Sequence, residues 1–168
     1  MPTATQVLLR EHEQIHAVVK PALQAAEDLS RRGAAAFPGH RAALLALADL
    51  LVGDLSRHSS KEEEIFFPVI ERLLGTTEGP TSVMRTEHSE IHAAGGRFRG
   101  LMADDGRPET GTVDPERARA LAKELRNFGE LVDVHFQKEE MILFPLAESR
   151  LPMEQQLALG ARLEGYPA

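Results

Sequence analysis

Residues 58–68 read HSSKEEEIFFP, and residues 135–145 read HFQKEEMILFP. A second pair of segments shows the same duplication, with EHEQIH at 11–16 and EHSEIH at 87–92. The offset is 77 residues for the first pair and 76 residues for the second. Two copies are too few for a solenoid of stacked repeats, so the duplication predicts two related helical hairpins.

Helix start and stop signals predict four long helices and a short fifth one. We expect the long helices at about 3–30, with a bend at Pro21, at about 40–74, from Thr81 or Ser82 to 103, and from Asp114 and Pro115 onward. A polar loop is expected at 104–112. Pro152 is expected to open the fifth helix, which ends near Gly165.

Two such hairpins bury their apolar faces by closing on each other. The sequence therefore predicts an all-α protein whose residues 1–150 form an antiparallel up-down four-helix bundle. Residues 151–168 are expected to form a short helical tail packed on or near this bundle.

The composition restricts both the partners and the chemistry. The net charge of −7 and the absence of a basic stripe argue against nucleic acid and against an acidic membrane surface. The sequence contains no cysteine, so any metal must sit on nitrogen and oxygen ligands. No signal peptide is visible, and no apolar run approaches the roughly 20 residues that span a membrane, so we expect a cytoplasmic protein.

Six of the seven histidines fall at a spacing of four residues from a second histidine or a glutamate. Residues at this spacing share one helix face and can reach one metal ion or two adjacent ones. The pairs are His12/His16, His58/Glu62, His88/His92 and His135/Glu139. One such pair alone is usually a solvated helix contact, whereas four duplicated pairs indicate a metal site. His40 stands outside the pattern, and we expect it at the surface or at a helix start.

Helical periodicity places two of these pairs on core faces. His58 and Glu62 lie within roughly 40° of the apolar stripe of their helix, and His135 and Glu139 lie within roughly 30° of theirs. A buried ionised carboxylate costs several kcal/mol, and no Lys or Arg lies on these stripes to compensate it. A pair of metal ions supplies the missing positive charge.

The remaining histidines fit the core faces less evenly. His12 lies near the centre of its apolar stripe, and His16 lies roughly 50° from it. His88 and His92 flank their stripe, so periodicity alone does not select both as ligands. The Lys61–Glu64 run is expected to be mostly solvated apart from Glu62.

Two further groups of residues have both a purely structural and a functional interpretation. Glu11 and Glu87 are expected at the surface or as hydrogen-bond partners of a ligand imidazole. The Phe-Phe-Pro and Leu-Phe-Pro segments are expected to form core and a helix kink rather than a substrate pocket, although they could also line the metals.

The order of these motifs resembles the hemerythrin-like, or HHE cation-binding, family over roughly residues 5–150. That order is a lone His, then HxxxE, HxxxH and HxxxE. The matching positions are His12, His58–Glu62, His88–His92 and His135–Glu139.

The resemblance implies a di-iron centre with a bridging oxo or hydroxo group. One iron would be held by His88, His92 and His135, and the other by His12 and His58. Glu62 and Glu139 would bridge the two ions. His16 is a further candidate ligand, which could complete the second iron or close its open position.

The last motif departs from that of the oxygen-carrying hemerythrins, which is HxxxxD. Glu139 lies one position earlier, which argues against simple oxygen transport. We expect a di-iron protein that binds or senses O2 or the related ligands NO and peroxide. The alternatives are a peroxide- or NO-consuming enzyme at the same site, an iron-storage or iron-sensing protein, and a bundle that carries zinc. The oligomeric state and the redox partner stay open.

Overall fold

The computed structural model describes residues 1–103 and 111–167, and all regular structure within these ranges is helical. This confirms the predicted all-α class. Most of the polar loop expected at 104–112 lies outside the described residues.

The helices group into four long segments and a short one. The first segment is α1 (Ala4–Arg32), which is followed by the single turn η1 (Gly33–Ala36). The second consists of α2 (Phe37–Val52), α3 (Asp54–Lys61), η2 (Glu62–Phe66) and α4 (Phe67–Leu74). The third is α5 (Pro80–Ala103). The fourth consists of α6 (Pro115–Lys138), η3 (Glu139–Leu143) and α7 (Phe144–Arg150), and the short segment is α8 (Met153–Glu164).

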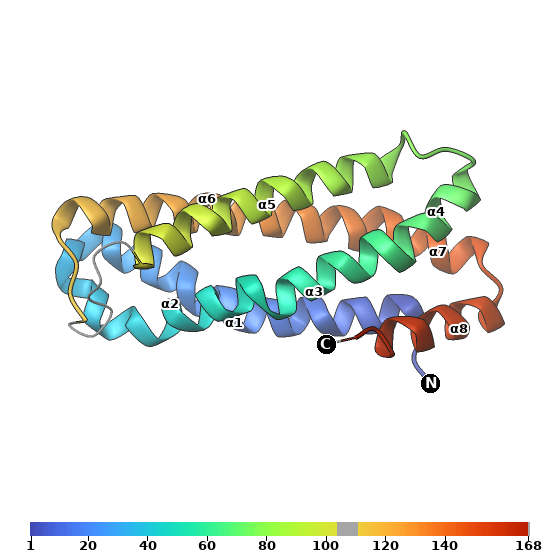
Figure 1. The fold of residues 1–168 in the computed structure, drawn as a ribbon, viewed down its shortest axis with the longest axis horizontal. Helices are drawn as coiled ribbons and strands as arrows, with labels where there is room; N and C mark the ends of the chain where they lie inside the picture. Colours follow the sequence, from blue (N-terminus) through green and yellow to red (C-terminus); the bar gives the residue numbers. More distant parts are fainter. Residues whose placement is uncertain (104–110, 168) are drawn as a thin grey trace.

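The four long segments lie side by side along the long axis of the molecule, and consecutive segments run in opposite directions (Figure 1). The helix α8 packs against α1, at the end of the molecule where both chain termini lie (Figure 1). A helix is therefore present where Pro152 and Gly165 predicted one.

Local sequence explains where the helices begin. Thr3 caps α1 in a reciprocal pair of hydrogen bonds with Gln6, and Asp114 caps α6 with Pro115 at its first position, as predicted. The start of α5 differs from the prediction, because the helix begins at Pro80. The hydroxyl of Thr81 donates instead to Glu71 at 2.9 Å.

The second segment is less regular than its apolar pattern predicted. It begins at Phe37 rather than near residue 40, and it is interrupted at Gly53. A π-helical turn, η2, then separates α3 from α4, and a second one, η3, separates α6 from α7.

The helical stretch Ala4–Leu74 contains an 18-residue window that is apolar enough to cross a membrane by length and composition, with a mean hydropathy of 1.3. This finding corrects the expectation that no apolar run approaches that length. Of this window, 33% is buried inside the protein. A helix in a protein core meets the same criterion, so the window alone does not identify a membrane span.

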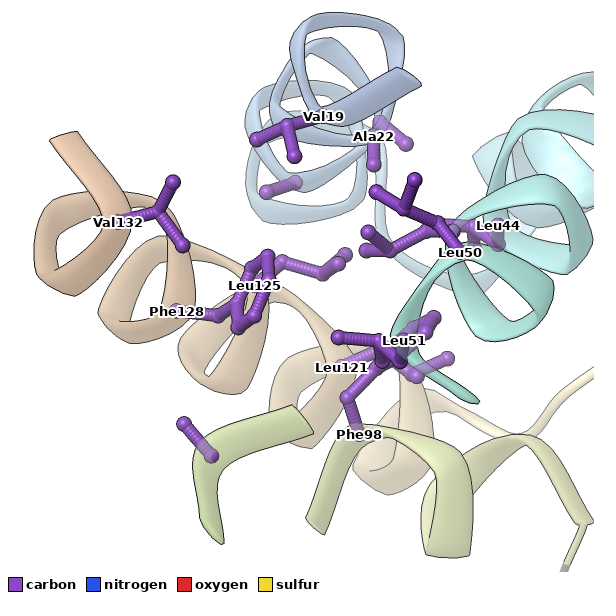
Figure 2. Close-up of a cluster of buried hydrophobic side chains, with 14 of the residues drawn as sticks. Val19, Ala22, Leu44, Leu50, Leu51, Phe98, Leu121, Leu125, Phe128 and Val132 are labelled. Atoms are coloured by element: carbon purple, nitrogen blue, oxygen red, sulfur yellow. The ribbon is translucent and has the colours of Figure 1, made fainter. Parts of the chain in front are cut away.

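The apolar side chains form two clusters along the molecule. The larger cluster joins α1, α2, α5 and α6, and Figure 2 shows Val19, Leu44, Phe98 and Phe128 pointing toward one another from these helices. The smaller cluster lies nearer the chain termini and includes Leu8, Phe66, Met84 and Leu143. Each long segment contributes to both clusters, so each contains a stretch of chain that passes between them.

Candidate metal centre

A buried polar layer occupies the stretch between the two apolar clusters. On each long segment, a histidine lies between a residue of the smaller cluster and one of the larger cluster, as His12 lies between Leu8 and Ile15. These histidines are His12, His58, His88 and His135. Together with Glu62 and Glu139 they are at most 3% exposed, so these six predicted site residues are all buried.

The two glutamates stand at the first residue of the two π-helical turns. The N–H of Phe67 donates to the carbonyl of Glu62, and the N–H of Phe144 donates to that of Glu139, five residues back in both cases. A proline follows each phenylalanine and has no N–H to continue the ladder. Such single π turns inside helices often mark functional sites. The two copies of the motif therefore share the π-helical turn as well as the pattern of residues.

The glutamate carboxylates lie among the imidazole Nε2 atoms. Glu62 lies 3.3 Å from His58 Nε2 and 3.1 Å from His88 Nε2. Glu139 lies 3.2 Å from both His135 Nε2 and His12 Nε2. Each glutamate thus faces one histidine of its own helix and one of the other hairpin.

Several polar atoms of this layer are buried and have no hydrogen-bond partner. They are Nε2 of His12, His58 and His135, Oε1 of Glu62, and both carboxylate oxygens of Glu139. A buried polar atom without a partner is costly and rare. Lone pairs that converge in this way indicate cation binding.

A second set of glutamates holds the outer nitrogen of each imidazole. His12 Nδ1 lies 2.7 Å from Glu140, and His88 Nδ1 lies 2.7 Å from Glu63. The Nδ1 atoms of the other two histidines lie 2.8 Å (His58 to Glu11) and 3.0 Å (His135 to Glu87) from their glutamates. With the proton on Nδ1 donated to a carboxylate, each Nε2 keeps its lone pair directed into the centre.

Two lysines complete this outer layer. Lys61 pairs with Glu11, and Lys138 pairs with Glu87. Lys61 is buried, which corrects the expectation that the Lys61–Glu64 run is mostly solvated. Glu11 and Glu87 are hydrogen-bonded to His58 and His135, which is the alternative to a purely surface position that the sequence analysis gave. The duplicated Lys-Glu-Glu triplet at 61–63 and 138–140 was the signal that could have identified Glu63 and Glu140.

The charges of this layer shift the pKa values of its groups. Burial alone would lower the pKa of His88, but the hydrogen bond and charge of Glu62 raise it to about 9. The pKa values of His58 and His135 are also raised against the effect of burial, chiefly by Glu62 and Glu139 respectively. The pKa of Glu139 is lowered despite its burial, by His12 and His135. The raised pKa values favour protonation of His58, His88 and His135 beside the buried carboxylates when no metal is bound.

The ligand atoms separate into two groups, each with its atoms within 4.8 Å of one another. One group is His12, His58, Glu62 and Glu139, and the other is Glu62, His88, His135 and Glu139. Both groups share the two glutamates, as expected for carboxylates that bridge two ions. Imidazole and carboxylate donors suit iron and zinc, so the residues fit a two-metal centre.

Two histidines of the sequence prediction lie outside both groups. His92 is exposed, and His16 is half-buried with its ring edge-on to Phe136 at 5.2 Å. They occupy equivalent positions of the repeat, one turn beyond His88 and His12. Their roles as ligands stay predictions. His40 bonds Asp28 at 2.8 Å near the start of α2, close to the role expected for it.

Aromatic rings enclose the centre unevenly. The ring of Phe136 stacks on His12 with centroids 3.7 Å apart, and Phe67 stacks on His88 at 5.6 Å. The residue that corresponds to Phe136 in the first copy of the motif is Ser59, so the two halves of the centre differ in their surroundings. A cavity of about 140 Å³ also reaches His58 from the α1 side, where it is lined by Glu11 and Lys61 among others.

Comparison with known proteins agrees with the family resemblance of the motifs. Residues 3–147 match the hemerythrin HHE cation binding domain. The chain is 34% identical over 104 residues to the iron-sulfur cluster repair protein YtfE of Escherichia coli O81 (strain ED1a), which covers 58% of this chain and 44% of the relative. It is 30% identical over 142 residues to the protein of the same name from Dickeya chrysanthemi (strain Ech1591), which covers 84% of this chain and 62% of the relative. The chain thus spans about half the length of these curated relatives, and no solved structure matches it significantly.

Proposed function

The chain belongs to the hemerythrin family of HHE cation-binding domains, and on this premise we propose that it is a non-haem di-iron protein. Its proposed role is to bind or sense O2 or the related small ligands NO and peroxide. The observation that carries the proposal is the set of buried, unpartnered nitrogen and oxygen atoms between the two apolar clusters.

In this proposal, His12 and His58 would hold one iron ion, and His88 and His135, with His92 as a further predicted ligand, would hold the other. The two ions would share Glu62 and Glu139. The bound iron pair would supply the redox and Lewis-acid chemistry that the side chains lack. The chain itself orients each imidazole through its Nδ1 partner and excludes water with buried phenylalanines such as Phe67 and Phe136. The described arrangement does not require His16 or His92.

The balance of ligands supports binding of small molecules over demanding oxidation. Ferritin-like di-iron proteins use four carboxylates and two histidines, whereas four imidazoles and two carboxylates leave less negative charge on the ions. The cavity of about 140 Å³ beside His58 has room for a diatomic molecule. Zinc is a less favoured occupant of the same residues.

A second candidate follows from the relatives, which are named as iron-sulfur cluster repair proteins. The same centre would then supply iron for damaged clusters as cargo rather than keep it as a cofactor. The sequence has no cysteine, so thiolates of this chain cannot hold an iron–sulfur cluster. Iron bound to the histidines and glutamates would have to be released to the client protein.

We also propose the finer structural assignment that residues 1–150 form an antiparallel up-down four-helix bundle of two repeated hairpins. The opposite directions of consecutive segments support this assignment (Figure 1). Residues 151–168 would be a helical tail on this bundle.

The test begins with metal content after native expression. We expect two irons per chain by elemental analysis and the optical bands of a bridged ferric pair. Glu62→Gln should reduce bound iron to one ion or less, because the variant loses one of the two shared carboxylates. Glu13→Gln, at an exposed position next to His12, is the matched control and should keep both ions.

The outcomes separate the alternatives. Zinc in place of iron, or more than two irons per chain, would contradict the proposal. Spectral change on adding NO or O2 supports a binding role, and turnover of peroxide would identify an enzyme instead. Transfer of iron to a cluster-free client protein, with loss of the optical bands, would favour the repair role.

A further inference from the structure

A cavity of about 370 Å³ lies between α4 and α8, and none of its lining residues belongs to the metal centre. The residues that line it are Val69, Arg72 and Leu73 of α4, and Leu151, Gln155, Ala158, Leu159 and Arg162 in or just before α8. Its volume lies within the range of small-molecule sites, roughly 300–1,000 Å³.

The lining combines an apolar floor with two cationic groups. Leu151 and Leu159 are buried side chains of the smaller apolar cluster, and Val69 and Leu73 pack against that cluster. Arg72 and Arg162 are both exposed. Within residues 1–103 and 111–167, neither guanidinium forms an ion pair or a hydrogen bond with another residue. Among the described residues, therefore, no carboxylate lies within ion-pair distance of either guanidinium group, although the protein has a net charge of −7.

The duplicated pattern does not account for these residues. The positions that correspond to Val69, Arg72 and Leu73 in the second copy hold Leu146, Ser149 and Arg150. The cationic position at 72 is thus particular to the first copy of the motif. Neither the repeat nor the metal centre explains why Arg72 lines a cavity.

We propose that this cavity binds an organic anion with a short aliphatic chain, either a medium-chain carboxylate or an alkyl phosphate. The planar guanidinium groups of Arg72 and Arg162 match the oxygens of such a head group. The aliphatic chain would lie on the leucines of the floor, where its burial is favourable. The amide of Gln155 offers a further hydrogen bond.

The test measures binding of decanoate, decyl phosphate and decanol to the intact, metal-loaded protein by titration calorimetry. We expect at least one anion to bind roughly tenfold or more tightly than decanol, because the alcohol lacks the charge that the arginines recognise. The stronger of the two anions identifies the head group. If neither anion binds, or if decanol binds as tightly, the proposal is wrong.

Three variants locate the site. The double variant Arg72→Gln/Arg162→Gln should weaken binding of the anion roughly tenfold or more, whereas Arg150→Gln, an exposed arginine outside the cavity, should leave it unchanged. Ala158→Leu places a larger side chain in the cavity at an exposed helical position and should also abolish binding. Circular dichroism and metal content should be unchanged in all three. Unaltered affinity in both the double variant and Ala158→Leu would overturn the assignment.

Discussion

Each inward-facing histidine of the centre is held at its outer ring nitrogen, Nδ1, by a glutamate. His88 is held at both nitrogens, because Nδ1 contacts Glu63 at 2.7 Å and Nε2 contacts Glu62 at 3.1 Å. An imidazole held at Nδ1 has a defined tautomer and a defined ring orientation, so its lone pair needs no reorganisation to bind a cation. In the proposed metal centre the outer glutamates would therefore take part in binding, although they do not face the centre.

Glu63→Ala tests this outer layer. The side chain of Glu63 is 37% exposed, so its removal should have little effect on folding. We expect the affinity for the metal pair to fall roughly 10–100-fold, because His88 loses the partner that orients it. Competition with a chelator of known affinity measures the change.

The matched control is Glu90→Ala, which removes an exposed carboxylate from the same helix as His88. Its metal affinity should equal that of the unaltered protein. Equal affinity in Glu63→Ala as well would show that the contact with Nδ1 has no part in metal binding.

Helical periodicity identified the inner glutamates of the centre, but it did not identify Glu63 and Glu140 of the outer layer. Periodicity within one helix identifies a residue that shares the apolar stripe of that helix, which is why Glu62 and Glu139 were found. Glu63 and Glu140 face away from their own stripes and reach histidines of the other hairpin. A pattern within one helix carries no information about which neighbouring helix will lie beside its flank.

At the scale of the element, the cap of α6 could be predicted, whereas the start of α5 and the π-helical form of the interruptions could not. Asp114 and Pro115 carry a strong local signal, and α6 begins there as expected. Periodicity assumes a constant rotation per residue, so it treats α3 to α4 and α6 to α7 as continuous α-helices. The π-helical turns at Glu62 and Glu139 lie directly before Phe67-Pro68 and Phe144-Pro145, whose prolines have no N–H to continue the ladder.

The contact between α8 and the start of α1 depends on one glycine. A Cβ built at Gly160 would overlap the carbonyl oxygen of Pro2 and lie 2.9 Å from the carbonyl carbon of Thr3. Both partners are backbone atoms, which cannot move without displacing the N-terminal cap of α1. The helix α8 can therefore reach α1 only with glycine at this position.

Gly160→Ala should lower the free energy of unfolding by about 1–3 kcal/mol, although alanine is the better helix former. Chemical denaturation measures the change. Gly100→Ala is the control, because a Cβ at this helical position meets nothing within 4 Å. That variant should be more stable by up to about 1 kcal/mol. A stabilised Gly160→Ala protein would show that α8 is not held tightly on α1.

At the scale of the molecule, a charged layer separates two apolar clusters, and its stability depends on which cations occupy it. In the metal-free protein, the raised pKa values of His58, His88 and His135 favour protons on these imidazoles as the cations. Metal ions require neutral imidazoles, so metal binding must release those protons. The same six residues thus stabilise the fold when cations compensate the carboxylates, and they destabilise it when no cation does.

The pKa of His88 gives the direction of this effect. It is raised from 6.5 to about 9 in the folded, metal-free protein. A raised pKa contributes stability that is complete below the unfolded value and is lost as the pH rises through the folded value. The free energy of unfolding of the metal-free protein should therefore fall between about pH 6.5 and pH 9, by at most about 3 kcal/mol for this group. The raised pKa values of His58 and His135 act in the same direction.

The metal-loaded protein should behave differently in the same pH range, because the ions replace the protons as the counter-charge of Glu62 and Glu139. We expect its stability to stay constant or to rise as the competing protons are removed. Urea denaturation at several pH values, with and without prior removal of metal by a chelator, measures both curves. Parallel curves would contradict this account, since they would mean that protons and metal ions do not compete for the same imidazoles.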